Sequence, residues 1–477
     1  MPDHSDTPAE QMSTEQRRLL AVVLVPVFMA LLAVSSINVV LPAIQSSIAA
    51  TDTQIQWILS GYTLTFGVVL VAAGRAGDAH GRGRLFVVGL ALFGLGSLAS
   101  GCATDGALLD LARLVMGVGS GLLNPQTVGF IQQYFSGVLR ARAFASFGAA
   151  VGLSVAIGPL MGGAFVQVFG AEWGWRATFL VNVPIALGAI VLARRWFPPS
   201  AFERDRRKGR ADLDPVGMLL FGLAVLLVML PFLERGFGPV VFVLTPLGLA
   251  LLGLWVWWER RYQRRGHQPM VNLELFRIRS YANGVMLIGL QFTGITSVYA
   301  IVAMYLQNGQ GATALHAALI GLPSAFATAI CSTIAGRVVL RMGRRLVAIG
   351  IVTALVAILG SIGVVAAHTA WGTSVWWLAV PLTFLGAGQG MVVSPNQTLS
   401  LLEVPAANSG SAGGVMQTGQ RIGTAIGIAF ITATFFVVQA SHGWDLAFVA
   451  AFAWIVLTIL LALTVALLDI RAARRQA

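Results

Sequence analysis

The chain has 477 residues, of which 57% are hydrophobic and only 10% are charged, and its formal net charge is +12. Soluble domains average about 45–50% apolar and about 25% charged residues, so this composition excludes an ordinary soluble protein and indicates a membrane protein. A basic charge can also mark nucleic-acid binding. No basic face interleaved with aromatic residues is visible, however, so nucleic acid is not an expected partner.

Residues 1–18 are expected to form a polar N-terminal tail in the cytoplasm. The opening stretch MPDHSDTPAEQMSTEQ lacks the basic start and the small-residue cleavage site of a signal peptide. The first apolar run is therefore expected to remain in the protein as a membrane anchor.

Fourteen apolar runs follow the tail, each near the length of about 20 residues that crosses a lipid hydrocarbon core. The runs are nearly continuous rather than alternating, which favours transmembrane helices over a membrane β-barrel. They span residues 19–44, 55–74, 85–103, 107–131, 143–169, 177–197, 215–233, 239–258, 281–305, 315–336, 346–367, 375–400, 411–439 and 446–469. The predicted fold class is an all-α membrane protein with 14 transmembrane helices.

The basic residues are distributed unevenly among the segments between these runs. With the N-terminus inside, 27 of the 31 basic residues fall in cytoplasmic segments, whereas the outer loops keep only Arg176 and Arg235. Cytoplasmic loops of membrane proteins carry such an excess, so both termini are expected in the cytoplasm. The single lysine among 30 arginines is typical of a GC-rich bacterial genome. We therefore expect a multi-pass protein of the bacterial cytoplasmic membrane.

A repeat divides the chain into two halves. GRAGDAHGRGRL begins at residue 74 and GRVVLRMGRRL at residue 336, which are 262 positions apart, and the first and ninth apolar runs are separated by the same interval. We therefore predict two six-helix bundles, residues 19–197 and 281–469. Residues 198–280 would add basic loops and two inserted helices, and residues 470–477 a cytoplasmic tail. Parallel repeats with a site between them are the plan of many transporters, and no channel filter is visible.

The first copy of the repeated loop carries a family pattern. Its residues resemble the loop signature of the major facilitator superfamily, G-x-x-x-D-x-x-G-R with a further basic residue. They are Gly74, Asp78, Gly81, Arg82 and Arg84. The resemblance implies that this loop latches the two halves together on the cytoplasmic side in the outward-open state. Membrane topology alone would also account for its arginines.

Asp78 is the most informative residue of this loop. An acid inside a basic turn is expected to pair with Arg82 or to cap the N-terminus of a helix. The second copy of the loop has Leu340 at the equivalent position. The predicted latch is therefore one-sided.

Other motifs resemble the 14-helix drug:proton antiporter branch of the same superfamily. NVVLP at 38–42 and WRATFLVNVP at 175–184 belong to this resemblance, whereas the fourth-helix pattern beginning at Arg113 resembles that of the superfamily as a whole, with Met116 where a Gln is usual. GPLMGG matches the fifth-helix element associated with antiporters, and it supplies Gly158, Pro159, Gly162 and Gly163. Gly158 and Gly162 form a G-x-x-x-G face that lets another helix approach closely. Plain helix packing, without a role in antiport, would also explain the motif.

Charged residues inside the predicted spans are candidates for coupling and substrate binding, because an arginine at mid-bilayer costs roughly 2.5–3.5 kcal/mol. Arg113 is one, and Asp110 lies three residues earlier, where it is expected to share a helix face and pair with it. Arg421 is the counterpart in the second half, where it reaches the cavity or extends toward the cytoplasm.

The usual acidic position of the first helix is occupied by Ala33. If protons are the coupling ion, their carrier is then Asp78, Asp110, a histidine such as His316, or the substrate itself.

Polar side chains within the spans outline a candidate substrate cavity. They are Asn38, Arg113, Asn124, Gln126, Gln291, Tyr299, Asn396, Gln397, Gln417, Gln420 and Arg421. Such a lining suits neutral, zwitterionic or anionic amphipathic molecules, whereas lipophilic dications need a buried carboxylate or an aromatic cage. Each amide could instead form a hydrogen bond between helices.

These patterns predict a secondary transporter that exports amphipathic organic compounds, such as drugs or antibiotics, by proton antiport and alternating access. The alternatives are an exporter dedicated to an endogenous lipid or secondary metabolite, and a membrane scaffold or sensor that does not transport. No nucleophile and base pair, metal-ligand spacing or nucleotide-binding loop is visible, so we expect no enzyme, catalytic residue, metal or cofactor. The expected partners are a small substrate, protons and the lipid bilayer, and a monomer is favoured.

Overall fold

The computed structural model describes residues 11–203, 213–233 and 239–476, and every regular element within these ranges is a helix. Much of the predicted N-terminal tail and the basic stretch 204–212 lie outside the described residues, as does Arg235. The long helices of the first half are α1 Thr14–Ser35, α2 Ile37–Ile48, α3 Asp52–His80, α4 Arg82–Gly101, α5 Gly106–Tyr134, α6 Gly137–Leu180 and α7 Asn182–Trp196.

Two inserted helices and the second half follow. The inserted helices are α8 Pro215–Leu233 and α9 Leu244–Arg264, and the second half comprises α10 Arg279–Met304, α11 Ala314–Met342, α12 Arg344–Trp371, α13 Ala379–Ser400 and α14 Ser409–Gln476. The short helices are η1 Pro199–Ala201, η3 Pro239–Val243, η4 Leu273–Arg277, η5 Tyr305–Gly309, η6 Val375–Leu378 and η7 Ala406–Asn408, of which η5 is a π-helix.

Twelve helical stretches of the described chain are long and apolar enough to cross a membrane, and two of them are far longer than one crossing needs. The stretch Gly137–Trp196 has 60 residues and Ala406–Arg471 has 66. Each contains a glycine with non-helical backbone, Gly170 with φ 78° and Gly443 with φ 82°. Positive φ is accessible to glycine without strain, so the chain turns there. Division at the two glycines gives fourteen segments, and both glycines fall between predicted runs.

The first predicted span, residues 19–44, is wrong in its boundaries. Helix α1 begins at Thr14 and ends at Ser35, and α2 continues from Ile37. One local feature accompanies the break. Ser35 donates its hydroxyl back to the Leu31 carbonyl at 2.9 Å, an interaction that bends helices.

Side-chain caps define the starts of several helices. Thr51 caps α3 in a capping box with Gln54, and Thr313 caps α11 by accepting a hydrogen bond from the backbone of His316. Asp105 caps α5 by accepting the Leu108 backbone N–H at 2.9 Å. That bond holds the pKa of the Asp105 carboxyl below its ordinary value.

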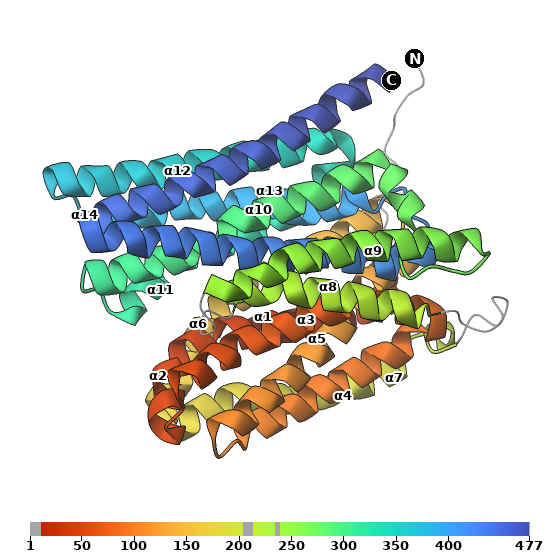
Figure 1. Ribbon diagram of the computed structural model, residues 1–477, viewed down its shortest axis with the longest axis horizontal. Coiled ribbons are helices and arrows are strands. Elements are labelled where there is room, and N and C mark those ends of the chain that lie inside the picture. Colours follow the sequence, from red (N-terminus) through yellow and green to blue (C-terminus); the bar gives the residue numbers. More distant parts are fainter. Residues whose placement is uncertain (1–10, 204–212, 234–238, 477) are drawn as a thin grey trace.

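Figure 1 shows the two halves as separate bundles, with the first half coloured red to yellow and the second green to blue. Helix α8 packs against α3 of the first half and α14 of the second, and α9 packs against α8. We call the end where α1 begins and α14 ends the basic end. There Gln132 of α5 donates to the Leu401 carbonyl at 2.7 Å, and Arg279 of α10 donates to the Leu468 carbonyl at 3.1 Å.

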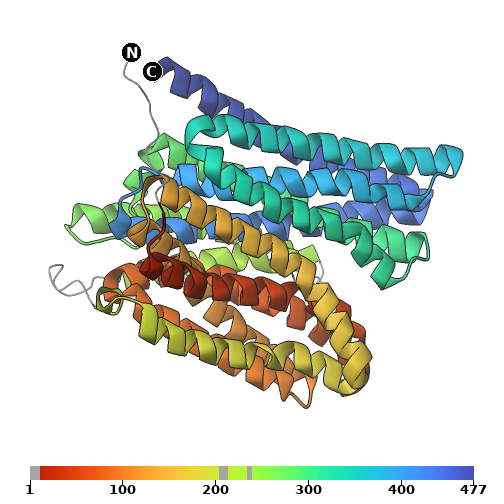
Figure 2. The ribbon, with the colours of Figure 1, turned by 180° about the vertical axis from the view of Figure 1, so that it is seen from behind.

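Helices α6 and α11 bring the two halves together. Figure 2 shows them side by side near the basic end and diverging toward the opposite end. Small residues permit the approach: a Cβ atom on Gly336 would lie 2.3 Å from that of Ala145, and one on Gly148 would lie 2.2 Å from the Ser332 hydroxyl. Helices α6 and α11 therefore approach each other closely where small residues face one another.

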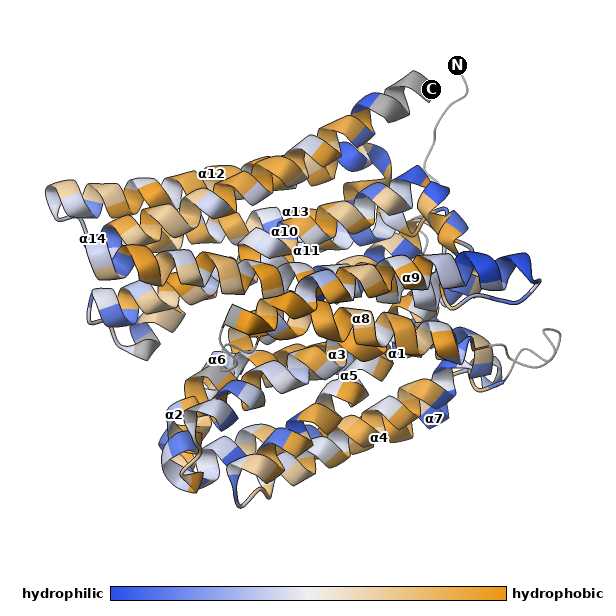
Figure 3. Cartoon of the chain, in the orientation of Figure 1, coloured by the Kyte–Doolittle hydropathy of each residue, from blue (hydrophilic) through white to orange (hydrophobic). Residues whose placement is uncertain are grey.

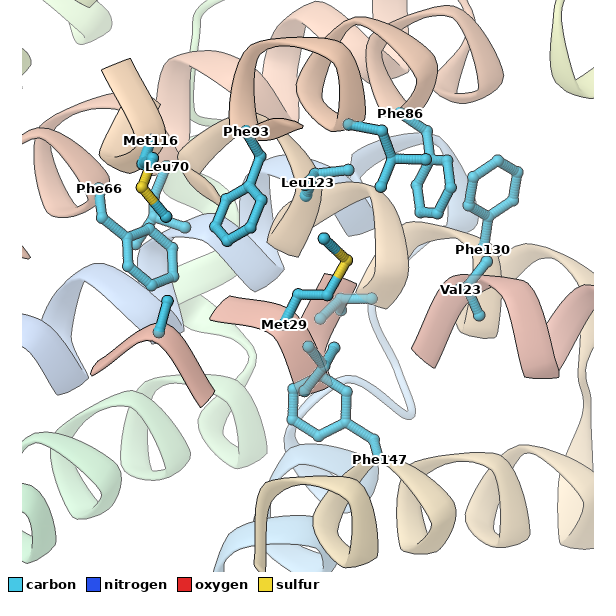
Figure 4. Close-up of a cluster of buried hydrophobic side chains, with 14 of the residues drawn as sticks. Val23, Met29, Phe66, Leu70, Phe86, Phe93, Met116, Leu123, Phe130 and Phe147 are labelled. Carbon is cyan, nitrogen blue, oxygen red and sulfur yellow. The ribbon is translucent and has the colours of Figure 1, made fainter. Parts of the chain in front are cut away.

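The polarity of the surface agrees with a membrane-embedded bundle. Figure 3 shows hydrophobic residues along the helices and hydrophilic residues gathered at their ends, most densely at the end of α9. Inside the first half, α1 and α3 to α6 contribute a continuous apolar cluster. Ten of its members are labelled in Figure 4: Val23, Met29, Phe66, Leu70, Phe86, Phe93, Met116, Leu123, Phe130 and Phe147. This core holds α3 and α5, which carry the polar residues described next.

Candidate functional site

The first loop element forms a buried ion pair. Asp78 lies in the last turn of α3 and Arg82 begins α4, and the chain reverses between them at Gly81, with φ 99°. Arg82 Nη2 lies 2.7 Å from Asp78 Oδ1, and the two side chains are 7% and 1% exposed. The positive φ at Gly81 favours glycine, because other residues adopt it with strain.

The same ion pair joins the two halves. Arg82 Nη2 donates to the Ala406 carbonyl and to the Ser409 hydroxyl, each at 2.8 Å. The two carboxylate oxygens of Asp78 accept the backbone N–H groups of Gly410 and Ser411 at 3.3 and 3.2 Å. Asp78 thus pairs with Arg82 and also caps the N-terminus of α14, where a negative charge is favoured.

Gly74 explains how α3 comes so close to α14. A Cβ atom on Gly74 would lie 2.3 Å from the Gly410 carbonyl oxygen, which is backbone and cannot move aside independently. Arg84, by contrast, is exposed. The loop residues Gly74, Asp78, Gly81 and Arg82 are therefore brought together at the contact between the halves, whereas Arg84 extends to the surface.

The second copy of the loop is organised differently. Arg344, at the position equivalent to Arg82, lies 2.8 Å from Asp469 Oδ2 at the end of α14. It also donates to Asn396 Oδ1 and to the Ser280 carbonyl, so these bonds stay within the second half. Leu340, at the position equivalent to Asp78, is 38% exposed.

The glycines of the fifth predicted helix face α1 and α2. A Cβ atom on Gly158 would lie 1.9 Å from the Ser35 hydroxyl, and one on Gly162 would lie 3.0 Å from the Ser36 carbonyl. Gly163 is less crowded, with its nearest contact at 3.8 Å, and Pro159 is half-buried. The structure therefore uses the G-x-x-x-G face for close helix packing.

Arg113 is buried against an aromatic ring of α3. It is 1% exposed, its Nε donates to the Ile58 carbonyl at 2.9 Å, and its guanidinium carbon lies 4.4 Å from the centre of the Tyr62 ring. The Tyr62 hydroxyl contacts the Ala30 carbonyl at 3.1 Å and the Ser120 hydroxyl at 2.7 Å. Arg113 Nη1 is buried without a hydrogen-bond partner, which leaves a donor available to an anion or a polar ligand.

Arg421 approaches the same helix from the other half. Its guanidinium carbon lies 4.3 Å from the centre of the Phe66 ring, and Phe66 contacts Tyr62 edge-on at 5.9 Å. Helix α3 thus presents two aromatic rings one turn apart. Arg113 of the first half lies over Tyr62, and Arg421 of the second half lies over Phe66. Of the two predicted alternatives for Arg421, extension into the interior is the one observed.

The expected pair between Asp110 and Arg113 is absent from the described structure. Asp110 is half-buried and its Oδ1 atom has no hydrogen-bond partner, while Arg113 is directed toward Ile58 and Tyr62. Separation by three residues puts two side chains on neighbouring positions of a helix, but the attraction of the aromatic ring and a carbonyl decides where the longer side chain lies.

Two of the predicted cavity amides, Gln126 and Asn396, instead join helices. Gln126 donates to the Ala73 carbonyl at 2.9 Å and Asn396 to the Gly284 carbonyl at 3.0 Å, whereas Asn124 donates to the Ser120 carbonyl within its own helix. The Tyr299 hydroxyl similarly meets the Ser324 hydroxyl at 2.8 Å. Their hydrogen bonds are therefore largely used by the fold.

Two amides of the second half retain unused capacity. Gln291 is fully buried and neither of its side-chain polar atoms has a partner, and the Gln417 nitrogen is also unpartnered. Gln397 is buried and Gln420 half-buried, while the side chain of Asn38 lies outside the described residues. Of the predicted cavity residues, Arg113, Gln126, Gln291 and Gln417 thus keep buried polar atoms without a hydrogen-bond partner.

Sequence reasoning missed three contributors to this arrangement. Phe66 follows Tyr62 by four residues, a spacing that places two rings on one helix face and could have been noticed. Asp469 is an acid at the end of the last apolar run, close to the basic tail. Ser409 offered no sequence signal, because its role depends on the contact between halves.

Comparisons with known proteins agree with this architecture. The family model described as Major Facilitator Superfamily matches residues 23–428 and 286–477. The chain is 33% identical to the "Probable actinorhodin transporter" of Streptomyces coelicolor, over 89% of this chain and 73% of that protein. It is 31% identical to the "Puromycin resistance protein pur8" of Streptomyces alboniger, over 90% of this chain and 85% of that protein.

Further likenesses concern a mycobacterial relative and two solved structures. The "Multidrug resistance protein Stp" of Mycobacterium tuberculosis is 32% identical, over 85% of this chain and 73% of that protein. The human organic anion transporter MFSD10 matches with a TM-score of 0.69 at 14% identity, over 95% of this chain and 100% of that chain. The proton:xylose symporter XylE matches with a TM-score of 0.65 at 15% identity, over 93% and 94%. At these identities, the structures support the fold alone.

Proposed function

The chain belongs to the major facilitator superfamily, and on this premise we propose that it exports neutral or anionic amphipathic compounds from the cytoplasm by proton antiport. It is a multi-pass membrane protein of the drug and antibiotic efflux type, and it is a secondary active transporter rather than an enzyme. The substrate class, the coupling ion and the bacterial cytoplasmic membrane as its location are parts of the proposal.

The proposed substrate class rests on the aromatic pair Tyr62 and Phe66 of α3, because an arginine lies over each ring. The cations at this place are Arg113, which is buried, and Arg421, which is half-buried, and they come from different halves. A planar amphipathic molecule can stack on an aromatic face while an anionic or polar group meets a guanidinium donor. The unpartnered Nη1 of Arg113 provides a further polar contact. A lipophilic dication would meet two positive charges here.

The loop between α3 and α4 fits a cytoplasmic latch for alternating access. Its ion pair binds the start of α14 at the basic end, which the excess of basic residues assigns to the cytoplasm. A contact of this kind must break when the transporter opens inward, because α3 and α14 belong to halves that move relative to each other. We assign this arrangement to the outward-facing state.

The names of the relatives guide the choice of test compounds. One relative is named for actinorhodin, another for puromycin resistance and a third for multidrug resistance. The same experiment should therefore include drugs as well as endogenous lipids or secondary metabolites, because these are the alternatives for the natural substrate.

Flux in sealed proteoliposomes tests the proposal. The panel contains neutral, anionic and cationic amphipathic compounds, each measured with and without an imposed pH gradient. We expect the gradient to stimulate movement of neutral or anionic compounds, and we expect substitution Arg113→Gln to reduce it. Movement that ignores the gradient would contradict antiport, and a preference for dications would contradict the substrate class.

A further inference from the structure

The inserted helices carry a buried acidic pair that the transport site does not use. Asp214 directly precedes α8, and Glu259 lies five residues before the end of α9. Both residues have an exposed fraction of 0%. Two ionised carboxylates in one buried place are unfavourable, because each loses its water and each repels the other.

Gly217 shows how close the two acids are. A Cβ atom on Gly217 would lie 2.3 Å from Asp214 Oδ2 and 3.1 Å from Glu259 Oε1. The two carboxyl groups therefore face each other across the space that one methyl group would fill. Glycine at this position leaves that space open.

The two acids have different surroundings. Asp214 Oδ1 accepts the Gly217 backbone N–H at 2.9 Å and the Trp258 indole N–H at 2.8 Å. Hydrogen bonds of this kind stabilise an ionised carboxylate. Neither oxygen of Glu259 has a partner at full hydrogen-bond geometry, and the neutral donors that interact with it are the backbone N–H groups of Met270 and Val271 and the indole of Trp255.

The charged groups around Glu259 do not neutralise it. Within the described chain, Asp214 is the charged group that acts on Glu259, and its sign is the same. Arg260 and Arg261 on α9 are exposed, as are Glu274 and Arg277 on η4. From α3, Arg75 donates to Gln268 at 3.0 Å, and His267 stacks on Tyr262 at 4.7 Å.

We propose that Glu259 and Asp214 form a proton-binding site in the inserted hairpin, with the proton on Glu259 and the charge on Asp214. A protonated Glu259 is neutral, which suits its burial, and its hydroxyl can donate to the facing oxygen of Asp214. Release transfers the proton from the Glu259 oxygen to water at the basic end, and no other bond changes.

The inserted hairpin connects this site to both halves through the packing of α8. Helix α8 packs on α3, where Met229 fills the space beside Gly67, and it also packs on α14. Ionisation of Glu259 would place a second buried charge at the base of α8, so the hairpin must admit water or shift. As a carrier for antiport, the site rests on the proposed function, whereas proton binding itself does not.

Infrared difference spectroscopy of the purified protein tests proton binding without any transport assay. We expect a carbonyl band of a protonated carboxyl group at neutral pH in the unmodified protein, its loss in Glu259→Gln, and its retention in the control Glu274→Gln. Glutamine keeps the shape and neutrality of the protonated acid, so the variant is expected to fold. An unchanged band in Glu259→Gln would overturn the proposal.

A second variant keeps the test decisive if Glu259→Gln does not fold. Asp214→Asn retains an oxygen that can cap α8 but removes the facing charge. The proton on Glu259 should then bind about tenfold more weakly, so that the band titrates at lower pH. A titration that does not move, or that moves to higher pH, would show that the two acids do not share the site.

Discussion

The two copies of the repeated loop use the same glycines and arginine for different contacts. In the first copy, Arg82 pairs with Asp78 of its own loop, and both bind the start of α14 in the other half. In the second copy, Arg344 pairs with Asp469 and its bonds remain inside its own half. At the position of Asp78 the second copy has Leu340, which cannot accept the two backbone hydrogen bonds that join the first loop to α14.

The substitution Asp78→Asn should have the largest effect on transport. It leaves Arg82 buried without its counter-charge, and removal of one partner from a buried pair costs about 3–5 kcal/mol. We expect flux per molecule to fall at least tenfold, with little loss of protein from the membrane. Flux in vesicles, normalised to the amount of inserted protein, checks this. Equal flux per molecule would refute a latch at this loop.

Asp469→Asn is the matched change in the second half. Because Arg344 and Asp469 join helices of one half, we expect a loss of about 3 kcal/mol in stability but flux per folded molecule within about twofold of the original. Thermal unfolding in detergent measures the first quantity and vesicle flux the second. A selective loss of flux at unchanged stability would mean that the two loops work alike.

Gly74→Ala and Gly336→Ala test the feature that the two copies share. At Gly74 the new methyl group would meet backbone of Gly410 at 2.3 Å, and at Gly336 it would meet the Ala145 side chain at 2.3 Å. Overpacking of this kind costs about 1–3 kcal/mol. We expect both variants to disfavour contact at the basic end, detected as faster labelling of cysteines placed between the halves. Unaltered labelling in either variant would show that its helices do not approach so closely.

The smallest effects are expected at equivalent helix caps. Thr51 and Thr313 cap α3 and α11 at positions 262 residues apart, but only Thr51 is reinforced by a capping box with Gln54. Loss of such a cap costs about 1 kcal/mol. Thr51→Ala should therefore lower the unfolding temperature slightly more than Thr313→Ala, as measured by differential scanning fluorimetry. The reverse order would show that the capping box contributes little.

The fold was predictable because it depends on patterns that the sequence displays directly. Apolar run length, basic loops and the 262-residue repeat locate the helices. The break at Gly443 falls within residues 440–445, which separate the last two predicted runs. The break at Ser36 was missed, because the hydrogen bond from the Ser35 hydroxyl to the Leu31 carbonyl lies inside an apolar run.

The candidate site was only partly predictable. The charge pattern suggested the partner of Asp78 but not its bonds to Gly410 and Ser411, which need the tertiary contact. The sequence indicates that Arg113 is important, yet the direction of its side chain depends on the Tyr62 ring, which lies on another helix. The sequence gives no signal that distinguishes one amide from another. The tertiary structure shows that Asn396 forms a hydrogen bond, whereas Gln291 has no hydrogen-bond partner.

The central claim is that the first loop, and not the second, fastens the two halves at the basic end. Spin labels on Arg195 and Arg345, exposed residues of opposite halves, would report this separation after Cys102 and Cys331 are replaced by serine. We predict that Asp78→Asn shifts the distance distribution to longer values, whereas Asp469→Asn leaves its mean unchanged. An identical distribution in Asp78→Asn, or the same shift in both variants, would contradict the claim.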